Sequence, residues 1–165
     1  MLAAQQGEHT QARARFAEGL PLLRRGDDLW DLALLLLNSG LEEAQAASPA
    51  AGELLTGALR TWQQLRGGGG MALALAGLSE VAASGGKPHR AGQLLGAAQA
   101  LLPSARPLLR VTVPYDLPRR VAVARADGDP AAFDRGLAEG QGWTIDRAVA
   151  AGLASTADPT GSHES

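Results

Sequence analysis

The feature that most constrains this chain is a pattern that recurs roughly 40 residues apart, a period typical of helical repeat proteins. Three segments align, and they begin at Ala12, Ala51 and Ala91. In each, a large apolar residue follows four positions after the alanine and a small residue follows three positions later. These spacings place the apolar residues on one side of an α-helix, where the small ones let a neighbouring helix approach closely. The period therefore predicts stacked helical units.

The segments between these three also favour helices, so each repeat is interpreted as a helix pair. Ala33-Leu34 matches Ala72-Leu73 at the same spacing, and glycines and prolines mark the helix ends. Pro21 is expected to kink the first helix, because proline lacks an N–H and clashes with the preceding turn. The fold class predicted is all-α, a right-handed solenoid of tetratricopeptide-like repeats. Its expected helices span about residues 10–25, 29–46, 50–66, 71–84 and 89–102.

The repeat pattern breaks between residues 103 and 118. Several prolines, Pro118 among them, block a continuous helix there, and Arg110 to Val113 resembles an extended stretch. Helices are expected again at about 119–127, 130–140 and 144–155, with Asp129-Pro130 and Thr144 as N-terminal signals. The expected organisation is a repeat region over 1–102 with its first repeat truncated, a Pro-rich connection over 103–118, closing helices over 119–155 and a disordered polar tail over 156–165.

Charge and composition exclude several classes of function. The formal net charge is −2, so the chain lacks the strong positive field that non-specific DNA binding needs, and no direct nucleic-acid partner is expected. There are no cysteines, which removes disulfides and sulfur-ligated metals. The longest apolar run, Leu32 to Leu37, is far shorter than the roughly 20 residues of a membrane span, and the N-terminus lacks a signal-peptide pattern. A cytoplasmic protein without membrane contact is expected.

Two stretches of the sequence carry a family resemblance. The first runs from Ala72 to Ala82 and continues from Arg90 to Leu101, and the second lies between Arg120 and Val149. They are similar to the last full repeat and the closing helices, respectively, of LuxR-type and SARP-type bacterial transcriptional activators with a STAND-class ATPase core, and of related cyclase-linked ATPases. The resemblance covers roughly residues 2–155. It implies a tetratricopeptide-like array that serves as the sensor or interaction end of a regulator.

The sequence also departs from that family. Gly67 to Gly70 stands where the family usually has a polar Gly-Asp turn, and Val111 to Pro114 is unusual. Such regulators place an ATPase core before the repeats and a DNA-binding domain at one end of the chain, and neither pattern occurs here. Leu2 to Gly7 resembles the end of a repeat's first helix. The chain is therefore expected to open within a repeat, as the product of a truncated gene, an internal start or a separately encoded tail.

Two glycine-rich segments invite comparison with phosphate-binding loops. Gly67 to Gly70 is followed by Met71-Ala72, although a P-loop requires lysine and then serine or threonine. Gly85-Gly86-Lys87 has the lysine, but Pro88 replaces the hydroxyl residue that would hold magnesium. Both segments are therefore interpreted as turns between helices, the first of them a flexible one.

The acidic residues and histidines do not form a metal or catalytic pattern. Carboxylates at a helix start interact with its N-terminal dipole by about 0.3–1 kcal/mol each, which explains Asp27 and Asp28 without catalysis. The histidines lie too far apart for a metal triad or a Ser–His–Asp arrangement. The acidic cluster comprises Asp27, Asp28, Asp31, Glu42 and Glu43. The histidines are His9, His89 and His163.

The tryptophans and arginines are also interpreted as structural residues. Trp30 and Trp62 fall beside apolar residues and are expected in the core, whereas Trp143 is expected to staple the start of the last helix. Solvated helix faces explain the arginines, with an acidic protein surface or the phosphate of a neighbouring domain's nucleotide as the alternative. The arginines form an early group of Arg13, Arg15, Arg24 and Arg25 and a later group of Arg106, Arg110, Arg119, Arg120 and Arg125.

The leading hypothesis is a non-catalytic protein-interaction or sensor module, whose concave helical surface receives a peptide, another domain or an inducer. The alternative is an inert or trans-acting fragment of a truncated STAND ATPase regulator without independent activity. An enzyme would need motifs that the sequence lacks, so no catalytic, cofactor or metal residue is assigned and no cofactor is expected. The expected partners are the ATPase or DNA-binding portion of a regulator, or a second copy of the chain. A small-molecule inducer is left open.

The predicted interaction residues lie on the first long helix. Phe16, Leu20 and Leu23 share one side of it, and burying each such side chain contributes roughly 1.5–3 kcal/mol. Because the preceding helix is expected to be cut short, this side would stay partly uncovered and favour self-association or binding of the missing portion. Arg13 and Arg24 complete the predicted set.

Overall fold

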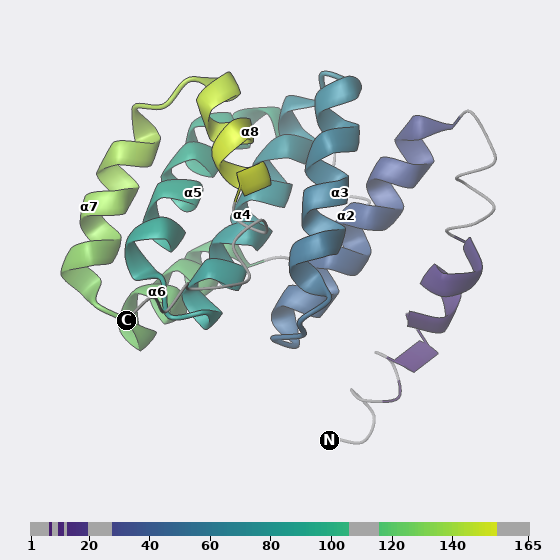
Figure 1. The fold of residues 1–165 in the computed structure, drawn as a ribbon, viewed down its shortest axis with the longest axis horizontal. Helices are drawn as coiled ribbons and strands as arrows, with labels where there is room; N and C mark the ends of the chain where they lie inside the picture. The colour runs from purple at the N-terminus through teal and green to yellow at the C-terminus, as the bar shows by residue number, and fades with distance from the viewer. Residues whose placement is uncertain (1–6, 8–9, 12, 20–27, 106–115, 155–165) are drawn as a thin grey trace, which may run out of the picture.

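The computed structural model describes residues 7, 10–11, 13–19, 28–105 and 116–154, and every element in this part of the chain is helical (Figure 1). No strand occurs among these residues, so the all-α prediction is confirmed for them. The elements are α2 (Leu29–Gln45), α3 (Ala51–Gln64), α4 (Gly68–Ser84), α5 (Pro88–Leu101), the 3₁₀-helix η1 (Leu102–Ala105), α6 (Leu117–Asp127), α7 (Pro130–Gln141) and α8 (Ile145–Ala154).

The helices form a row in which each packs on its neighbours. From α2 to α5, consecutive helices are in contact, and α5 then packs against α7 at the end of the row (Figure 1). Helices two apart also meet, because α4 touches both α2 and α6. Helix α8 turns back and lies on α3, α4 and α5. Helical residues 13–19 lie against α2, where Gly19 approaches the side chain of Leu35.

The repeat pattern identifies residues of the core. The small and large apolar residues that align in the second and third segments are all buried, and Phe16 of the first segment packs against the same core. Alanines at the small positions keep helix axes close, while leucines fill the space between them. The six buried positions of the second and third segments are Ala51, Leu55, Ala58, Ala91, Leu95 and Ala98.

Side-chain caps explain where several helices begin. The carboxylate of Asp28 accepts from Asp31 N at the start of α2, and that of Asp129 accepts from Ala131 N at 3.0 Å at the start of α7. Thr144 Oγ1 accepts from Arg147 N at 3.2 Å before α8. These oxygens satisfy N–H groups that the first turn leaves unpaired. The N-terminal signals at Asp129-Pro130 and Thr144 are thereby confirmed.

Two turn predictions have different outcomes. Gly85-Gly86-Lys87 is a turn between α4 and α5, with Gly86 at a positive φ of 73°. The flexible turn expected at Gly67 to Gly70 is wrong, because α4 already begins at Gly68. The indole of Trp62 lies against Gly67 and Gly70 so closely that a Cβ at either position would collide with it. These glycines therefore make room for a buried tryptophan at a helix start.

Two other expectations, on Pro118 and on Trp30, need correction. Pro118 lies in the first turn of α6, where its missing N–H needs no partner, so it begins a helix instead of blocking one. Trp62 is in the core, but Trp30 is 44% exposed and meets only the edge of that core, with its ring centroid 6.2 Å from that of Trp62. Trp143 is half-buried against the core, and the guanidinium of Arg147 lies 4.9 Å from its ring centroid.

Some predictions fall on residues that the structure does not describe. These are the kink at Pro21, the extended stretch from Arg110 to Val113 and the disordered tail over 156–165. Within the described ranges, no helix combines the length and apolar character that crossing a membrane requires.

Candidate functional site

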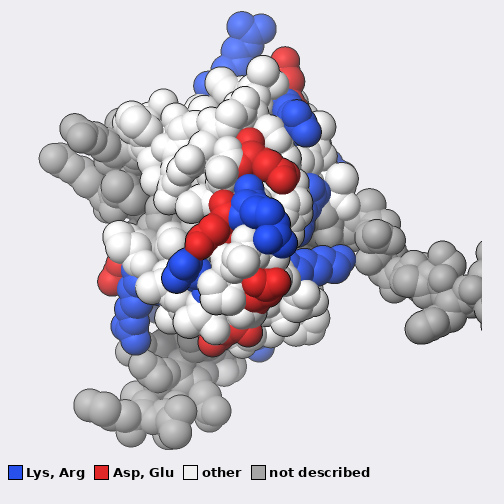
Figure 2. Space-filling model, turned by 90° about the vertical axis from the view of Figure 1, so that its left-hand side faces the viewer, with Lys and Arg blue, Asp and Glu red and all other residues white. Residues whose placement is uncertain are grey.

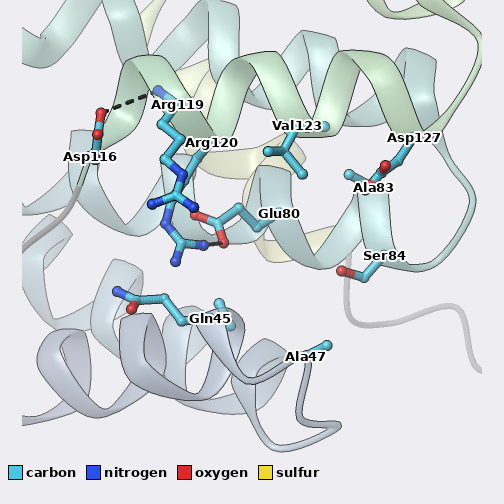
Figure 3. A pocket seen from close by; sticks show the side chains of 12 residues that line it. Gln45, Ala47, Glu80, Ala83, Ser84, Asp116, Arg119, Arg120, Val123 and Asp127 are labelled. Carbon is cyan, nitrogen blue, oxygen red and sulfur yellow. Dashed lines mark hydrogen bonds and ion pairs between the residues drawn. The ribbon is translucent and has the colours of Figure 1, made fainter. Parts of the chain in front are cut away.

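A cleft of about 460 Å³ opens between α2, α4 and α6. Its lining comes from alternate helices of the row, with the end of α2 on one side, α6 on the other and Glu80 of α4 between them (Figure 3). Polar and apolar groups both line it, since Val123 and Ala124 lie beside charged residues of α6. The cleft thus combines a surface for packing with groups that can fix a ligand's orientation.

Two consecutive arginines of α6 reach into the cleft. Asp116 caps this helix by accepting from Arg119 N at 3.2 Å, and Pro118 occupies its first turn. The cap and the proline fix the start of the helix, and hence the positions from which Arg119 and Arg120 project. Figure 3 shows both side chains running from α6 toward Gln45 of α2.

The two arginines differ in their partners. Arg120 Nη1 donates to Glu80 Oε2 in an ion pair between α6 and α4, and the Glu80 side chain is only 12% exposed. Arg119 is exposed, and its guanidinium forms no ion pair with any residue that the structure describes. A guanidinium without a carboxylate partner keeps its N–H donors available for an incoming carboxylate or carbonyl group.

The other end of the cleft is negative. Asp127 is the last residue of α6 and Ser84 the last of α4, and both lie at this end (Figure 3). Helix C-termini carry a partial negative charge, which adds to the carboxylate of Asp127. Along α6, the backbones of Arg119 and Asp127 are separated by about 12 Å, at a rise of about 1.5 Å per residue. The guanidinium of Arg119 thus lies toward the end of the cleft that Asp116 also lines, and the carboxylate of Asp127 lies at the other end.

The predicted interaction residues lie elsewhere. Arg13 donates through Nε and Nη2 to the carboxylate of Glu43 on α2, and these hydrogen bonds, together with the negative charge of Glu43, raise the pKa of Arg13 above its ordinary value. Phe16 is half-buried and packs against the core. Leu20, Leu23 and Arg24 lie outside the described residues. Self-association through this side of the chain therefore stays a prediction.

The described members of the acidic cluster and His89 do not gather into a metal-binding group. Asp28 caps α2 and Glu43 binds Arg13, while Asp27, His9 and His163 lie outside the described residues. In the part of the chain that the structure describes, no group of three or more His, Cys, Asp or Glu side chains is placed to hold a metal ion.

His89 belongs to a surface cluster that joins α5 to α7. Gln93 Nε2 donates to Glu139 Oε2 at 2.7 Å, and His89 Nε2 lies 3.2 Å from Glu139 Oε1. The hydrogen bond from Gln93, followed by that from His89, lowers the pKa of Glu139 below its ordinary value. These contacts connect two neighbouring helices at their exposed edges.

The later arginine group is divided. Arg106 and Arg110 lie outside the described residues, and Arg119 and Arg120 line the cleft. Arg125 instead forms two hydrogen bonds of 2.8 Å with Asp134 of α7, which lower the pKa of that carboxyl group. On the face that α7 covers, acidic and basic side chains are interspersed (Figure 2). The described arginines of this group, Arg119, Arg120 and Arg125, therefore do not gather into one basic patch.

The sequence prediction did not identify the cleft. The sequence placed Arg119 and Arg120 only in a group of arginines, because nothing in it indicated that they lie beside Glu80 and the C-terminal end of α2. One signal was available: Glu80 and Arg120 lie 40 residues apart, which is the repeat spacing. Opposite charges one period apart can meet between stacked helices of a repeat protein.

No family model, curated protein or solved structure matches the chain. The resemblance to STAND-class regulators therefore stays a prediction that depends on the residues quoted for it.

Proposed function

We propose that the chain is a non-catalytic protein-interaction module, in which helix pairs form a right-handed tetratricopeptide-like array and a peptide segment of a partner protein binds in the cleft between α2, α4 and α6. One observation carries the proposal. The cleft is lined by every second helix of the row and contains a guanidinium, that of Arg119, with no carboxylate partner among the described residues.

The order of the helices supports a repeat array. In a stack of helix pairs, the first helices of successive pairs lie side by side and line one face, and such arrays use an extended concave face for binding. Here α2 and α4 would be the first helices of two pairs, with α3 and α5 as their partners, and α6 would continue the face that α2 and α4 line. The contacts of α4 with both α2 and α6 are those that this arrangement requires.

The charges of the cleft indicate what kind of peptide would fit. An acidic side chain would meet Arg119, and a basic side chain would meet Asp127 at the other end. An extended peptide covers the separation of about 12 Å in about four residues, at about 3.3 Å per residue. The expected ligand is therefore a short segment with an acidic and a basic residue about four positions apart, with apolar contact to Val123 between them.

Selection from a library of random peptides tests this proposal. The full chain should enrich peptides with the expected charge pattern, and their affinity should fall about tenfold in Arg119→Glu, because a charge-assisted hydrogen bond is replaced by repulsion. Arg135→Glu is the matched control, since Arg135 is an exposed arginine of α7 that does not line the cleft. It should leave the affinity unchanged.

Two results would contradict the proposal. One is a selection that enriches no peptide, and the other is a set of peptides that binds Arg119→Glu as tightly as the unmodified chain. A partner that is the ATPase or DNA-binding portion of a regulator should present the same charge pattern in the segment that binds. That identity stays a prediction, as does the absence of catalysis.

A further inference from the structure

A second pocket, of about 530 Å³, lies where α4, α5 and α8 meet. Leu78, Val81 and Ala82 of α4 give it an apolar wall, and Lys87 and Arg90 lie on the side where α5 begins. None of the described residues that line it is acidic. None of the described residues lines both this pocket and the cleft between α2, α4 and α6, so an inference about the pocket does not depend on the proposed function.

Arg90 is the unusual residue of this pocket. Its side chain is half-buried and donates through Nη2 to the carbonyl oxygen of Ala151 in the last turn of α8. Within the described ranges, no carboxylate pairs with it. Buried charges in proteins are normally paired, because removing them from water is unfavourable. Burial lowers the pKa of Arg90, as expected for a cation that loses water without gaining an anion.

Lys87 adds a second cation. It is exposed, precedes the first turn of α5 and forms no ion pair in the part of the chain that the structure describes. The ammonium of Lys87 and the remaining N–H groups of Arg90 can therefore both donate to one anionic group. Leu78 and Val81 leave apolar surface next to these donors.

We propose that this pocket binds a small anion with an aliphatic tail, such as a medium-chain carboxylate. The carboxylate lies against Arg90 and Lys87, and the tail covers Leu78 and Val81. The volume of the pocket falls within the range of about 300–1,000 Å³ that is typical of small-molecule sites. Tight binding requires both the carboxylate and the tail. The cations orient the carboxylate, and the contact of the tail with the apolar wall supplies most of the buried area.

A titration of the isotopically labelled full chain with hexanoate, followed by nuclear magnetic resonance, tests the proposal. Hexanoate should bind saturably with a dissociation constant of about 1 mM, a reasonable value for so small a ligand. The largest shifts are expected at Val81, Gly85 and Arg90. Acetate, which has the charge without the tail, and hexanol, which has the tail without the charge, should each bind about tenfold more weakly or worse.

Variants separate the role of charge from that of fold. Arg90→Gln keeps an N–H donor for the carbonyl of Ala151 but removes the charge, and it should weaken hexanoate binding about tenfold. Arg60→Gln is the matched control, because Arg60 is exposed on α3 and does not line the pocket. If Arg90→Gln does not fold, Lys87→Glu decides the question, since it introduces repulsion at an exposed position.

The proposal is overturned if hexanoate causes no saturable shift around the pocket. It is equally overturned if hexanol binds as tightly as hexanoate, because the site would then be only an apolar depression. Unchanged affinity in a folded Arg90→Gln variant, or in Lys87→Glu where Arg90→Gln does not fold, would also contradict it.

Discussion

The α5–α7 contact and the contacts among α2, α3 and α4 use glycine in opposite ways. Gly92 of α5 and Gly136 of α7 each face the other helix so closely that an added Cβ would collide with a backbone carbonyl oxygen. Gly40 of α2 and Gly77 of α4 instead face a side chain, that of Leu55 on α3. A Cβ at Gly40 or Gly77 would lie 2.7 or 2.8 Å from Leu55.

The difference shows that one residue type can serve two kinds of helix packing. Where glycines of both helices meet, the backbones themselves are in contact and neither can retreat without separating the helices. Where a glycine faces a leucine, the side chain can change rotamer and relieve part of a clash. We therefore expect the α5–α7 contact to tolerate added atoms poorly, and the contacts of Leu55 to be most sensitive to lost atoms.

The largest effect is expected from Gly140→Ala in α7. Helix propensity alone predicts that this change stabilises the protein by about 1 kcal/mol. The new Cβ would collide with the carbonyl oxygen of Gln93 on α5, so we expect the free energy of unfolding to fall by about 4 kcal/mol, beyond the usual range for overpacking. Urea denaturation followed by circular dichroism would measure it.

Gly142→Ala is the matched control for Gly140→Ala. Gly142 caps the same helix with a negative φ, and its Cβ would make an ordinary contact of 3.5 Å with Glu139 O. A change of at most about 0.5 kcal/mol is expected there. If Gly140→Ala were also neutral, the close approach of α5 and α7 would be wrong.

The next effect is expected from Leu55→Ala. Leu55 is fully buried, and its side chain fills the space beside Gly40 and Gly77. These glycines have no side chains that could fill the cavity left by the substitution. A loss of about 3 kcal/mol is expected. Leu54→Ala, at the half-buried neighbouring position, is the control and should lose clearly less. Equal losses at the two positions would show that Leu55 is not the centre of this packing.

A smaller effect is expected from Asp129→Ala. Asp129 caps α7 by accepting from two backbone N–H groups, whereas Ala50, the N-cap residue of α3, provides no side-chain cap. The loss should be about 1 kcal/mol, as for other N-caps. Asp127→Ala removes a nearby carboxylate that caps nothing and should change the stability by less than about 0.5 kcal/mol. A neutral Asp129→Ala would mean that α7, like α3, is held by packing alone.

The helices were predictable from sequence because their signal is local. Apolar periodicity and caps such as Asp129 placed most helix ends within about three residues. What could not be predicted depends on residues distant in sequence. Nothing near Gly92 indicates that it meets α7, and nothing near Gly70 distinguishes a flexible turn from a helix start under Trp62. The cleft could not be predicted for the same reason, because Arg120 contributes to it through an ion pair with Glu80, which is distant in sequence.

The smallest effect is expected from Gly57→Ala, which also gives the sharpest test of the comparison between glycines at the α5–α7 contact and glycines that face side chains. Gly57 lies in the interior of α3, and an added Cβ would make only an ordinary contact of 3.6 Å with Leu36 Cδ1. The substitution restricts the unfolded chain and removes a poor helix former, so a gain of about 0.5–1 kcal/mol is expected. The chemical change is identical to that at Gly140, and both positions are helical, so propensity predicts the same sign for both. Opposite signs in urea denaturation would show that the neighbouring helix decides the outcome. A loss at Gly57 similar to that at Gly140 would instead indicate that a property of the glycines themselves, and not the close approach of α5 and α7, explains both.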